Sequence, residues 1–275
     1  MLLLLLLALP MMAQDLDADF AKAIEEINQG RFDRAAVKLS PVQSLIYQKN
    51  GGKFPTFDAR MRSRMNEMGT TAAVLTTIAL LKSQMEAKNF EEAEPQMRLV
   101  NAGLSRLWFQ VPANQKLNYA KQDIEGANAW IKDGLVRKLG YAAVDVGEWE
   151  TAKEAANEMI VMSEQKDYRG LDPGMLKHSA LTIRGLVEFG LSDMAAADKT
   201  LVESMRVRGE MIMRSSGPSF RLAQLLLKNG RKQAVDEFLV LVGESVWRES
   251  SKVADWRKEL AAGKVPNFGG WSGVY

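Results

Sequence analysis

The residue types that most often perform catalysis or hold metals are scarce in this chain. It has 275 residues, no cysteine and a single histidine, His178. The absence of cysteine excludes disulfides, thiolate nucleophiles and cysteine-ligated metals. One histidine is too few for the usual zinc sites and for most histidine-based acid–base chemistry. His178 could line a groove and titrate near neutral pH, but alone we interpret it as a structural residue. We therefore expect no metal, no cofactor and no enzymatic activity.

Two other groups of residues suggest chemistry at first sight. Glu91, Glu92 and Glu94 offer neighbouring carboxylates, but they stand at the start of a predicted helix, where negative charge complements the helix dipole. We interpret them as a solvated cap. Residues 51–53, Gly-Gly-Lys, have neither the upstream glycine nor the following serine or threonine of a phosphate-binding loop, so they predict a flexible connector.

The composition and the spacing of apolar residues indicate an ordered helical protein. The chain is 47% hydrophobic and 25% charged, which suits one large or two small domains. Lys and Arg number 36 against 34 Asp and Glu, and this near balance gives no support for binding nucleic acid. Apolar residues recur at three- and four-residue spacing, with no convincing alternation of strand type. The fold class predicted is all-α, with about ten helices divided by glycine, proline and asparagine.

A short pattern recurs at the turns between the predicted helices. A turn residue is followed by a large aromatic or apolar residue, two polar residues and an alanine, and the last two copies are weaker than the first three. The alanine lets the second helix of a hairpin approach the first closely, and the aromatic residue plugs the end of the hairpin. The copies span residues 30–35, 88–93, 147–152, 192–197 and 229–234.

This pattern resembles the tetratricopeptide repeat (TPR), in which a small residue of the first helix meets an alanine of the second. Leu139-Gly140 with Ala152, and Gly185 with Ala197, match that pairing best. The resemblance implies a right-handed α-solenoid of about five antiparallel helical hairpins over residues 14–262. The alanines are 58, 59, 45 and 37 residues apart, against about 34 in the family, so the first units must carry longer helices or loops. The residues expected to pack the repeats are Phe32, Ala35, Phe90, Ala93, Gly140, Trp149, Ala152, Gly185, Ala197 and Ala234.

The N-terminus has the features of an export signal. Leu2 to Leu7 form an apolar run, Pro10 follows, and Ala13 leads into polar residues. A run this short that ends in a small residue is typical of a secretory signal and not of a membrane span. We expect a signal peptide over residues 1–13, cleavage after Ala13, no membrane span once it is removed, and a periplasmic or secreted protein.

The C-terminal segment differs from the rest of the chain. Its glycines and its proline rule out a helix over residues 263–275. We expect its aromatic residues to dock back on the chain and cap the last hairpin, and capture of a partner is the alternative. Just before it, Val253, Trp256 and Leu260 are spaced for a short amphipathic capping helix.

The function implied by this architecture is binding of a peptide or protein partner. The first helices of stacked hairpins form a concave face that offers an extended groove. An alternative is a structural subunit of an envelope assembly, and a less favoured one is an enzyme acting on the cell wall. The residues expected to line the groove are Asn118, Tyr119, Lys121, Trp130, Lys177, Arg184 and Arg221.

Overall fold

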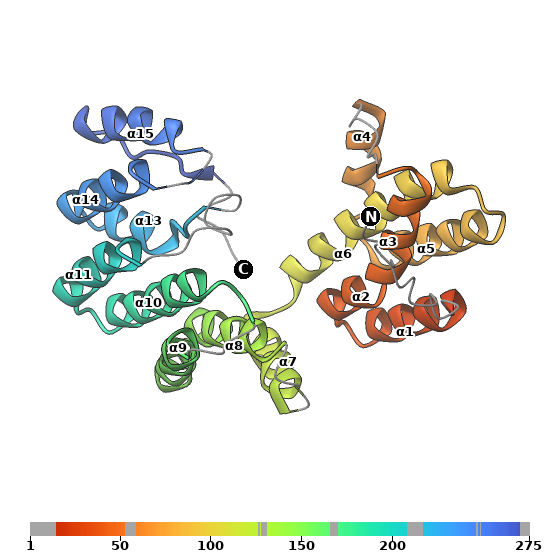
Figure 1. Ribbon diagram of the computed structural model, residues 1–275, viewed down its shortest axis with the longest axis horizontal. Helices are drawn as coiled ribbons and strands as arrows, with labels where there is room; N and C mark the ends of the chain where they lie inside the picture. The colour runs from red at the N-terminus through yellow and green to blue at the C-terminus, as the bar shows by residue number, and fades with distance from the viewer. Residues whose placement is uncertain are drawn as a thin grey trace, which may run out of the picture. The chain divides into compact units, whose positions relative to one another are not determined.

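The structure is a computed structural model that describes residues 15–52, 59–125, 127, 131–165, 170–207, 217–245, 247 and 249–269. The regular elements of these residues are α-helices, with no strand among them, so the predicted all-α class is confirmed. Fourteen helices lie in the described residues, against about ten predicted. The chain divides into two compact units, Met1–Val111 and Pro112–Tyr275, which we call unit 1 and unit 2 (Figure 1).

Unit 1 is organised around its longest helix, α6. Helices α1 and α2 pack together, α5 packs against α6, and α2 and α3 also lie against α6. An added Cβ at Gly103 of α6 would lie 2.5 Å from Val74 Cγ2 of α5, so these two helices approach closely. Its helices are α1 (Leu16–Asn28), α2 (Phe32–Lys38), α3 (Ser40–Lys49), α4 (Ala59–Glu67), α5 (Thr71–Glu86) and α6 (Phe90–Gln110).

One of the additional helices of unit 1 arises at a proline. Helix α2 ends at Lys38, and α3 begins at Ser40 with Pro41 in its first turn. A proline is tolerated there because the first N–H groups of a helix have no partner within the helix. Pro41 therefore divides the second helix of the first hairpin in two.

Unit 2 is a series of helices in which each packs against the next. Helix α10 is the most enclosed, since it contacts α8, α9, α11 and α13 and buries 11 of its 18 residues. Figure 1 shows the helices of this unit along an arc, with α8, α10 and α13 on the inner side and α9, α11 and α14 on the outer side. The helices are α7 (Ala113–Glu125), α8 (Lys132–Val146), α9 (Trp149–Ser163), α10 (Pro173–Gly190), α11 (Met194–Met205), α13 (Arg221–Lys228), α14 (Lys232–Gly243) and α15 (Ser251–Ala261).

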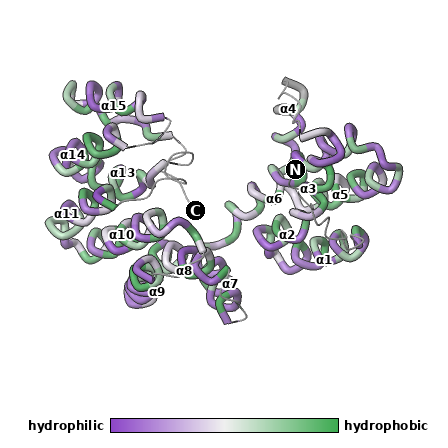
Figure 2. The backbone as a smooth tube through the Cα atoms, viewed as in Figure 1, coloured by the Kyte–Doolittle hydropathy of each residue, from purple (hydrophilic) through white to green (hydrophobic). Residues whose placement is uncertain are grey.

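The helices are amphipathic, as their spacing of apolar residues predicted. Hydrophobic and hydrophilic residues alternate along the helices of each unit (Figure 2). In α15 the buried residues are Val253, Trp256 and Leu260, the three that the sequence singled out. Within the described ranges, no helix is both long and apolar enough to cross a membrane.

The five turns marked by the recurring pattern share one backbone geometry. In each, a residue in the left-handed region follows the first helix, and the next N–H donates to a carbonyl oxygen five residues earlier, at 2.8–3.0 Å. This is the Schellman arrangement, which satisfies carbonyl groups at the end of a helix. In each case the second helix begins two residues after the left-handed residue. The left-handed residues are Gly30 (φ 73), Lys88 (φ 55), Gly147 (φ 77), Ser192 (φ 65) and Gly230 (φ 78).

The alanines of the pattern lie at a fixed distance from these turns. Ala35, Ala93, Ala152 and Ala197 each follow the left-handed residue by five positions, and each has no exposed surface. The fifth copy differs by one residue. Counting from Gly230, its counterpart is Val235, which is fully buried, whereas Ala234 precedes it and keeps 9% exposure. The position of the aromatic plug is then occupied by Lys232.

Two glycines mark equivalent close contacts in successive hairpins. An added Cβ at Gly140 would lie 2.7 Å from Ile183 Cδ1 and 3.2 Å from Ala155 Cβ. An added Cβ at Gly185, 45 residues further on, would overlap Leu222 and lie 3.3 Å from Thr200 Cγ2. Each glycine therefore faces the second helix of its own hairpin and the first helix of the next.

The contacts of these glycines differ in detail from the predicted pairs. The sequence paired them with Ala152 and Ala197, whereas the residues that they meet lie three positions further along α9 and α11. Trp149, at the start of α9, packs over Gly147 and over Gly190 at the end of α10, where an added Cβ would overlap its ring. Of the other residues expected to pack repeats, Phe32 is buried and Phe90 half-buried.

The shared turn geometry leads to opposite effects for two substitutions. Ser192 adopts a left-handed conformation that costs a non-glycine residue about 1 kcal/mol, so Ser192→Gly should raise the free energy of unfolding by roughly that amount. Gly230→Ala should lower it by about 1 kcal/mol, because no atom lies within 4 Å of the added Cβ and only the backbone is strained. Urea unfolding followed by circular dichroism measures the free energy of unfolding of both variants. Effects of the same sign would contradict the left-handed conformation assigned to these two residues.

The glycine contacts between hairpins give a second matched pair. Gly185→Ala should destabilise unit 2 by about 1–3 kcal/mol, since the methyl group overlaps Leu222. Gly134→Ala, in the first turn of α8, meets no atom within 4 Å and should stabilise the helix by up to about 1 kcal/mol. Thermal unfolding of both variants provides the comparison. A Gly185→Ala protein as stable as the original would show that the close approach does not exist.

Candidate functional site

His178 is a buried residue that joins three segments of unit 2. It lies on α10 with 3% exposure. Its Nε2 accepts a hydrogen bond from the Ser219 N–H at 2.9 Å, and its Nδ1 lies 2.9 Å from the carbonyl oxygen of Ser204 in α11. Because Nε2 accepts, Nδ1 carries the proton and donates, so the ring is neutral. Burial lowers the pKa of His178, which favours that neutral state. The interpretation of His178 as a structural residue is confirmed.

The acidic group at the start of α6 is only partly solvated. Glu91 and Glu92 are exposed in the first turn, as expected of a cap. Glu94 is 3% exposed and forms an ion pair with Arg98 one turn later, so the interpretation as a solvated cap was wrong for this residue. The physical reason is that α6 contacts α2, α3, α4 and α5, which leaves little of its surface free.

The connector over residues 51–53 lies partly outside the described residues. Gly51 and Gly52 follow α3 with φ values of 65 and 72, a conformation that suits a turn. Lys53 is outside the described ranges. Within those ranges, no group of three or more histidine, aspartate or glutamate residues is placed to hold a metal ion.

The residues expected to line a groove lie on several helices of unit 2. Asn118 is exposed on α7, and the Tyr119 hydroxyl accepts a hydrogen bond from Gln115. Trp130 lies outside the described residues. The four cations come from α7, α10 and α13, and each forms an ion pair with a carboxylate. The pairs are Lys121 with Glu148 (2.8 Å), Lys177 with Glu164 (3.1 Å), Arg184 with Glu188 (3.1 Å), and Arg221 with Asp145.

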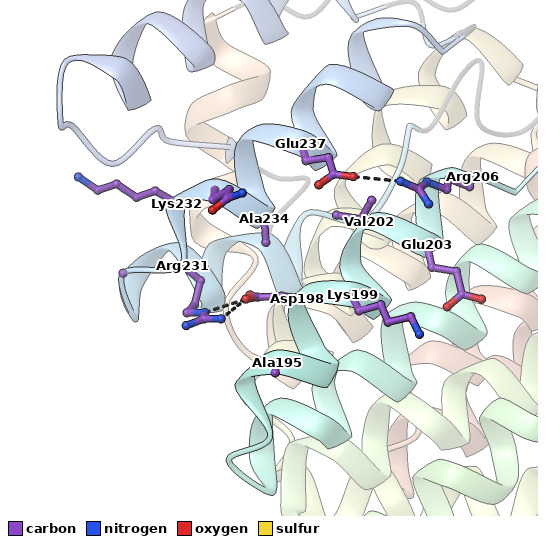
Figure 3. Close-up of a pocket in the computed structure, with 12 residues that line it drawn as sticks. Ala195, Asp198, Lys199, Val202, Glu203, Arg206, Arg231, Lys232, Ala234 and Glu237 are labelled. Carbon is purple, nitrogen blue, oxygen red and sulfur yellow. Dashed lines mark hydrogen bonds and ion pairs between the residues drawn. The ribbon is translucent and has the colours of Figure 1, made fainter.

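A hollow on the described surface of unit 2 lies between α11 and α14. Its volume is about 800 Å³. We call it the α11–α14 groove, and Figure 3 shows its side chains. Small side chains of Ala195, Val202 and Ala234 contribute apolar surface between charged ones. The lining residues are Ala195, Asp198, Lys199, Val202, Glu203, Arg206, Gly230, Arg231, Lys232, Gln233, Ala234 and Glu237.

Two ion pairs connect α11 with the beginning and the first turns of α14. Arg231 Nε donates to Asp198 Oδ2 at 2.8 Å, and Arg206 Nη2 donates to Glu237 Oε1 at 3.0 Å (Figure 3). The hydrogen bond and the charge of Asp198 raise the pKa of Arg231 above its ordinary value. These pairs place charged groups of both signs on either side of Val202 and Ala234.

Three further charged residues of the α11–α14 groove are left available to a ligand. Lys199, Glu203 and Lys232 are exposed, and none forms an ion pair with another described residue. Lys199 and Lys232 belong to different helices, so a bound segment could contact both. An exposed surface with fixed and available charges beside small apolar side chains suits recognition of a polar peptide.

The groove continues toward the start of α10. A neighbouring hollow of about 510 Å³ shares Glu203 and Arg206 with it. This second hollow includes Lys177 with its partner Glu164, and Leu181. Of the expected groove residues that the structure describes, Lys177 is the one that lines either hollow.

The sequence reasoning placed the groove on the first helices of the hairpins, whereas the α11–α14 groove lies on second helices. A signal was present in α11, where Asp198, Lys199, Val202, Glu203 and Arg206 follow one another at helical spacing on one face. That stripe alone does not reveal which helix lies opposite. No family model, curated protein or solved structure matches this chain.

The buried histidine leads us to expect an acid-sensitive fold. The folded state lowers the pKa of His178, so the unfolded chain binds a proton more readily below about pH 6.5. The stability due to the neutral ring is complete above that pH and is lost as the pH falls toward the lowered pKa. Urea unfolding between pH 7.5 and 5 should show this decline. In the variant His178→Gln, whose side chain cannot titrate, the free energy of unfolding should decline less steeply with falling pH. Equal slopes in the variant and the original chain would contradict the role given to the His178 ring.

Proposed function

We propose that this chain is an exported, TPR-like interaction module that binds a peptide or protein partner in the α11–α14 groove. The observation that carries the proposal is the arrangement of charge in that groove. Asp198–Arg231 and Arg206–Glu237 fix four charges across two helices, while Lys199, Glu203 and Lys232 stay available. Binding of charged side chains by such a surface needs little rearrangement, which favours affinity.

The repeated turns support the architectural part of the proposal. All five have one Schellman geometry, and Gly140 and Gly185 make equivalent contacts with successive hairpins. Equivalent contacts repeated along a chain are the basis of a solenoid, because each hairpin then buries its apolar face on the next. We therefore propose a right-handed solenoid of TPR type for the hairpins of unit 2.

The dimensions and lining of the groove indicate the class of ligand. Val202 and Ala234 present small side chains between the two ion pairs, so a main chain could lie close to α11 and α14. Side chains of a bound segment would then reach Lys199 on one helix and Lys232 on the other. Acidic side chains suit these two positions best, because a carboxylate is attracted most strongly to a cation that has no other ion-pair partner.

The test is affinity capture with the mature chain that begins at Gln14, applied to an extract of the native envelope. A double variant, Lys199→Glu with Lys232→Glu, reverses both available cations. We expect it to retain at least tenfold less partner, with the free energy of unfolding changed by less than about 0.5 kcal/mol, as is usual for exposed positions. Quantitative mass spectrometry of the retained proteins gives the measurement.

The matched control makes the same change of net charge elsewhere. Lys22 and Lys49 are exposed in unit 1 and form no ion pair with described residues, so Lys22→Glu with Lys49→Glu should retain the partner like the original chain. Equal losses in both double variants would assign the effect to net charge and contradict a site in the groove. The absence of any stoichiometric partner would contradict the binding function itself.

A further inference from the structure

Five aromatic residues meet at the C-terminal end of unit 2. Phe220, at the start of α13, lies centrally, with ring centroids 5.4 Å from Phe238, 5.8 Å from Trp247 and 5.2 Å from Trp256. These four residues form what we call the aromatic socket. Phe268 occupies it, with ring centroids 5.0 Å from Phe220 and 5.2 Å from Trp256.

The occupant comes from a segment that has no regular structure. Helix α15 ends at Ala261, Gly263 follows with a φ of 77, and residues 264–268 are neither helix nor strand. Pro266 and Phe268 are buried, whereas Val265 and Asn267 are exposed. Side chains thus alternate between buried and exposed positions, as they do in an extended peptide bound to a protein surface. Phe268 thus docks back on its own chain, as we expected for the aromatic residues of the tail, of which Trp271 and Tyr275 lie outside the described residues.

The segment is held by side chains and not by its main chain. Residues 265–268 form no main-chain hydrogen bond with another described residue, and the Asn267 side chain accepts only from the nearby Gly269 N–H. Before them, the Lys264 N–H closes the turn by donating to Glu259. The segment is therefore attached through the apolar surface that Pro266 and Phe268 bury. It can be released without breaking a ladder of main-chain hydrogen bonds.

The walls of the socket contact one another independently of the occupant. Phe220 touches Phe238 edge to face, and Trp247 stacks with Trp256 at 6.2 Å. Gly217 lets the chain pass against Trp247, where an added Cβ would lie 2.5 Å from the indole ring. A pocket whose walls are in mutual contact can keep its shape when the occupant leaves.

We propose that the aromatic socket is a peptide-binding site for an extended segment with an apolar residue and, two positions later, phenylalanine, and that residues 264–269 are its built-in occupant. The site is separate from the α11–α14 groove, and the proposal does not depend on the groove. The attached tail competes with any free segment of the same kind, because a short connection gives it a high effective concentration.

The experiment uses the full chain and a synthetic peptide of residues 262–269. Phe268→Ala vacates the socket in an intact chain. We expect this variant to bind the peptide at least tenfold more tightly than the original chain does, with a change in the fluorescence of Trp247 and Trp256. A peptide with Phe268→Ala should bind at least tenfold more weakly, and a peptide with Asn267→Ala should bind normally, since Asn267 is exposed. No saturable binding to the variant, or equal binding to both chains, would overturn the proposal.

A second measurement covers the case in which Phe268→Ala does not fold. A protease site inserted between Gly263 and Lys264, both exposed, allows the tail to be cut from the folded chain. The cut tail should dissociate on dilution and be replaced by added peptide, as native mass spectrometry would show. A tail that stays bound after cutting, and that excess peptide does not exchange, would show that the segment is a fixed part of the core.

Discussion

A left-handed residue at the end of a first helix is the constraint on which the hairpins depend. At Gly30, Lys88, Gly147, Ser192 and Gly230 the chain reverses in the same way, and the second helix starts two residues later. Because the turn is short and always the same, the residue five positions after it is buried in the seam of the hairpin. That position tolerates alanine or, in the last copy, valine. Gly140 and Gly185 lie where one hairpin meets the next, and an added Cβ at either would overlap a side chain of the next hairpin.

Much of this local structure could be predicted from the sequence. Turn residues, the alanines and the capping residues Val253, Trp256 and Leu260 act over a few positions, so their spacing identifies them. The last copy shows the limit of that reasoning. Alignment on Ala234 selects a residue at the rim of the groove, whereas alignment on Gly230 selects the buried Val235. The glycine was the better guide because it determines where the chain turns.

The surface features could not be predicted in the same way, since they depend on which helices lie opposite one another. The α11–α14 groove joins residues about 30 positions apart through Asp198–Arg231 and Arg206–Glu237. Glu94 is buried because several helices surround α6, a fact that the start of one helix does not reveal. Arg184 and Arg221 were chosen as groove residues from their type and place, but each is engaged by a carboxylate of unit 2.

Unit 2 thus offers two surfaces with different chemistry. The groove presents paired and available charges, so the binding that we propose there would favour charged partners and would weaken with added salt. The aromatic socket presents apolar surface and is occupied by the chain's own Phe268. A partner that used both would have to carry acidic side chains and an aromatic residue.

The most direct test of binding in the groove is site-specific photo-crosslinking in the native extract. A photoreactive residue at Gln233, which is exposed in the groove, should give one discrete crosslinked product. The same residue at Glu154, exposed on α9 and outside the lining of the groove, should give none. A product formed only from Glu154, or equally from both positions, would contradict the account.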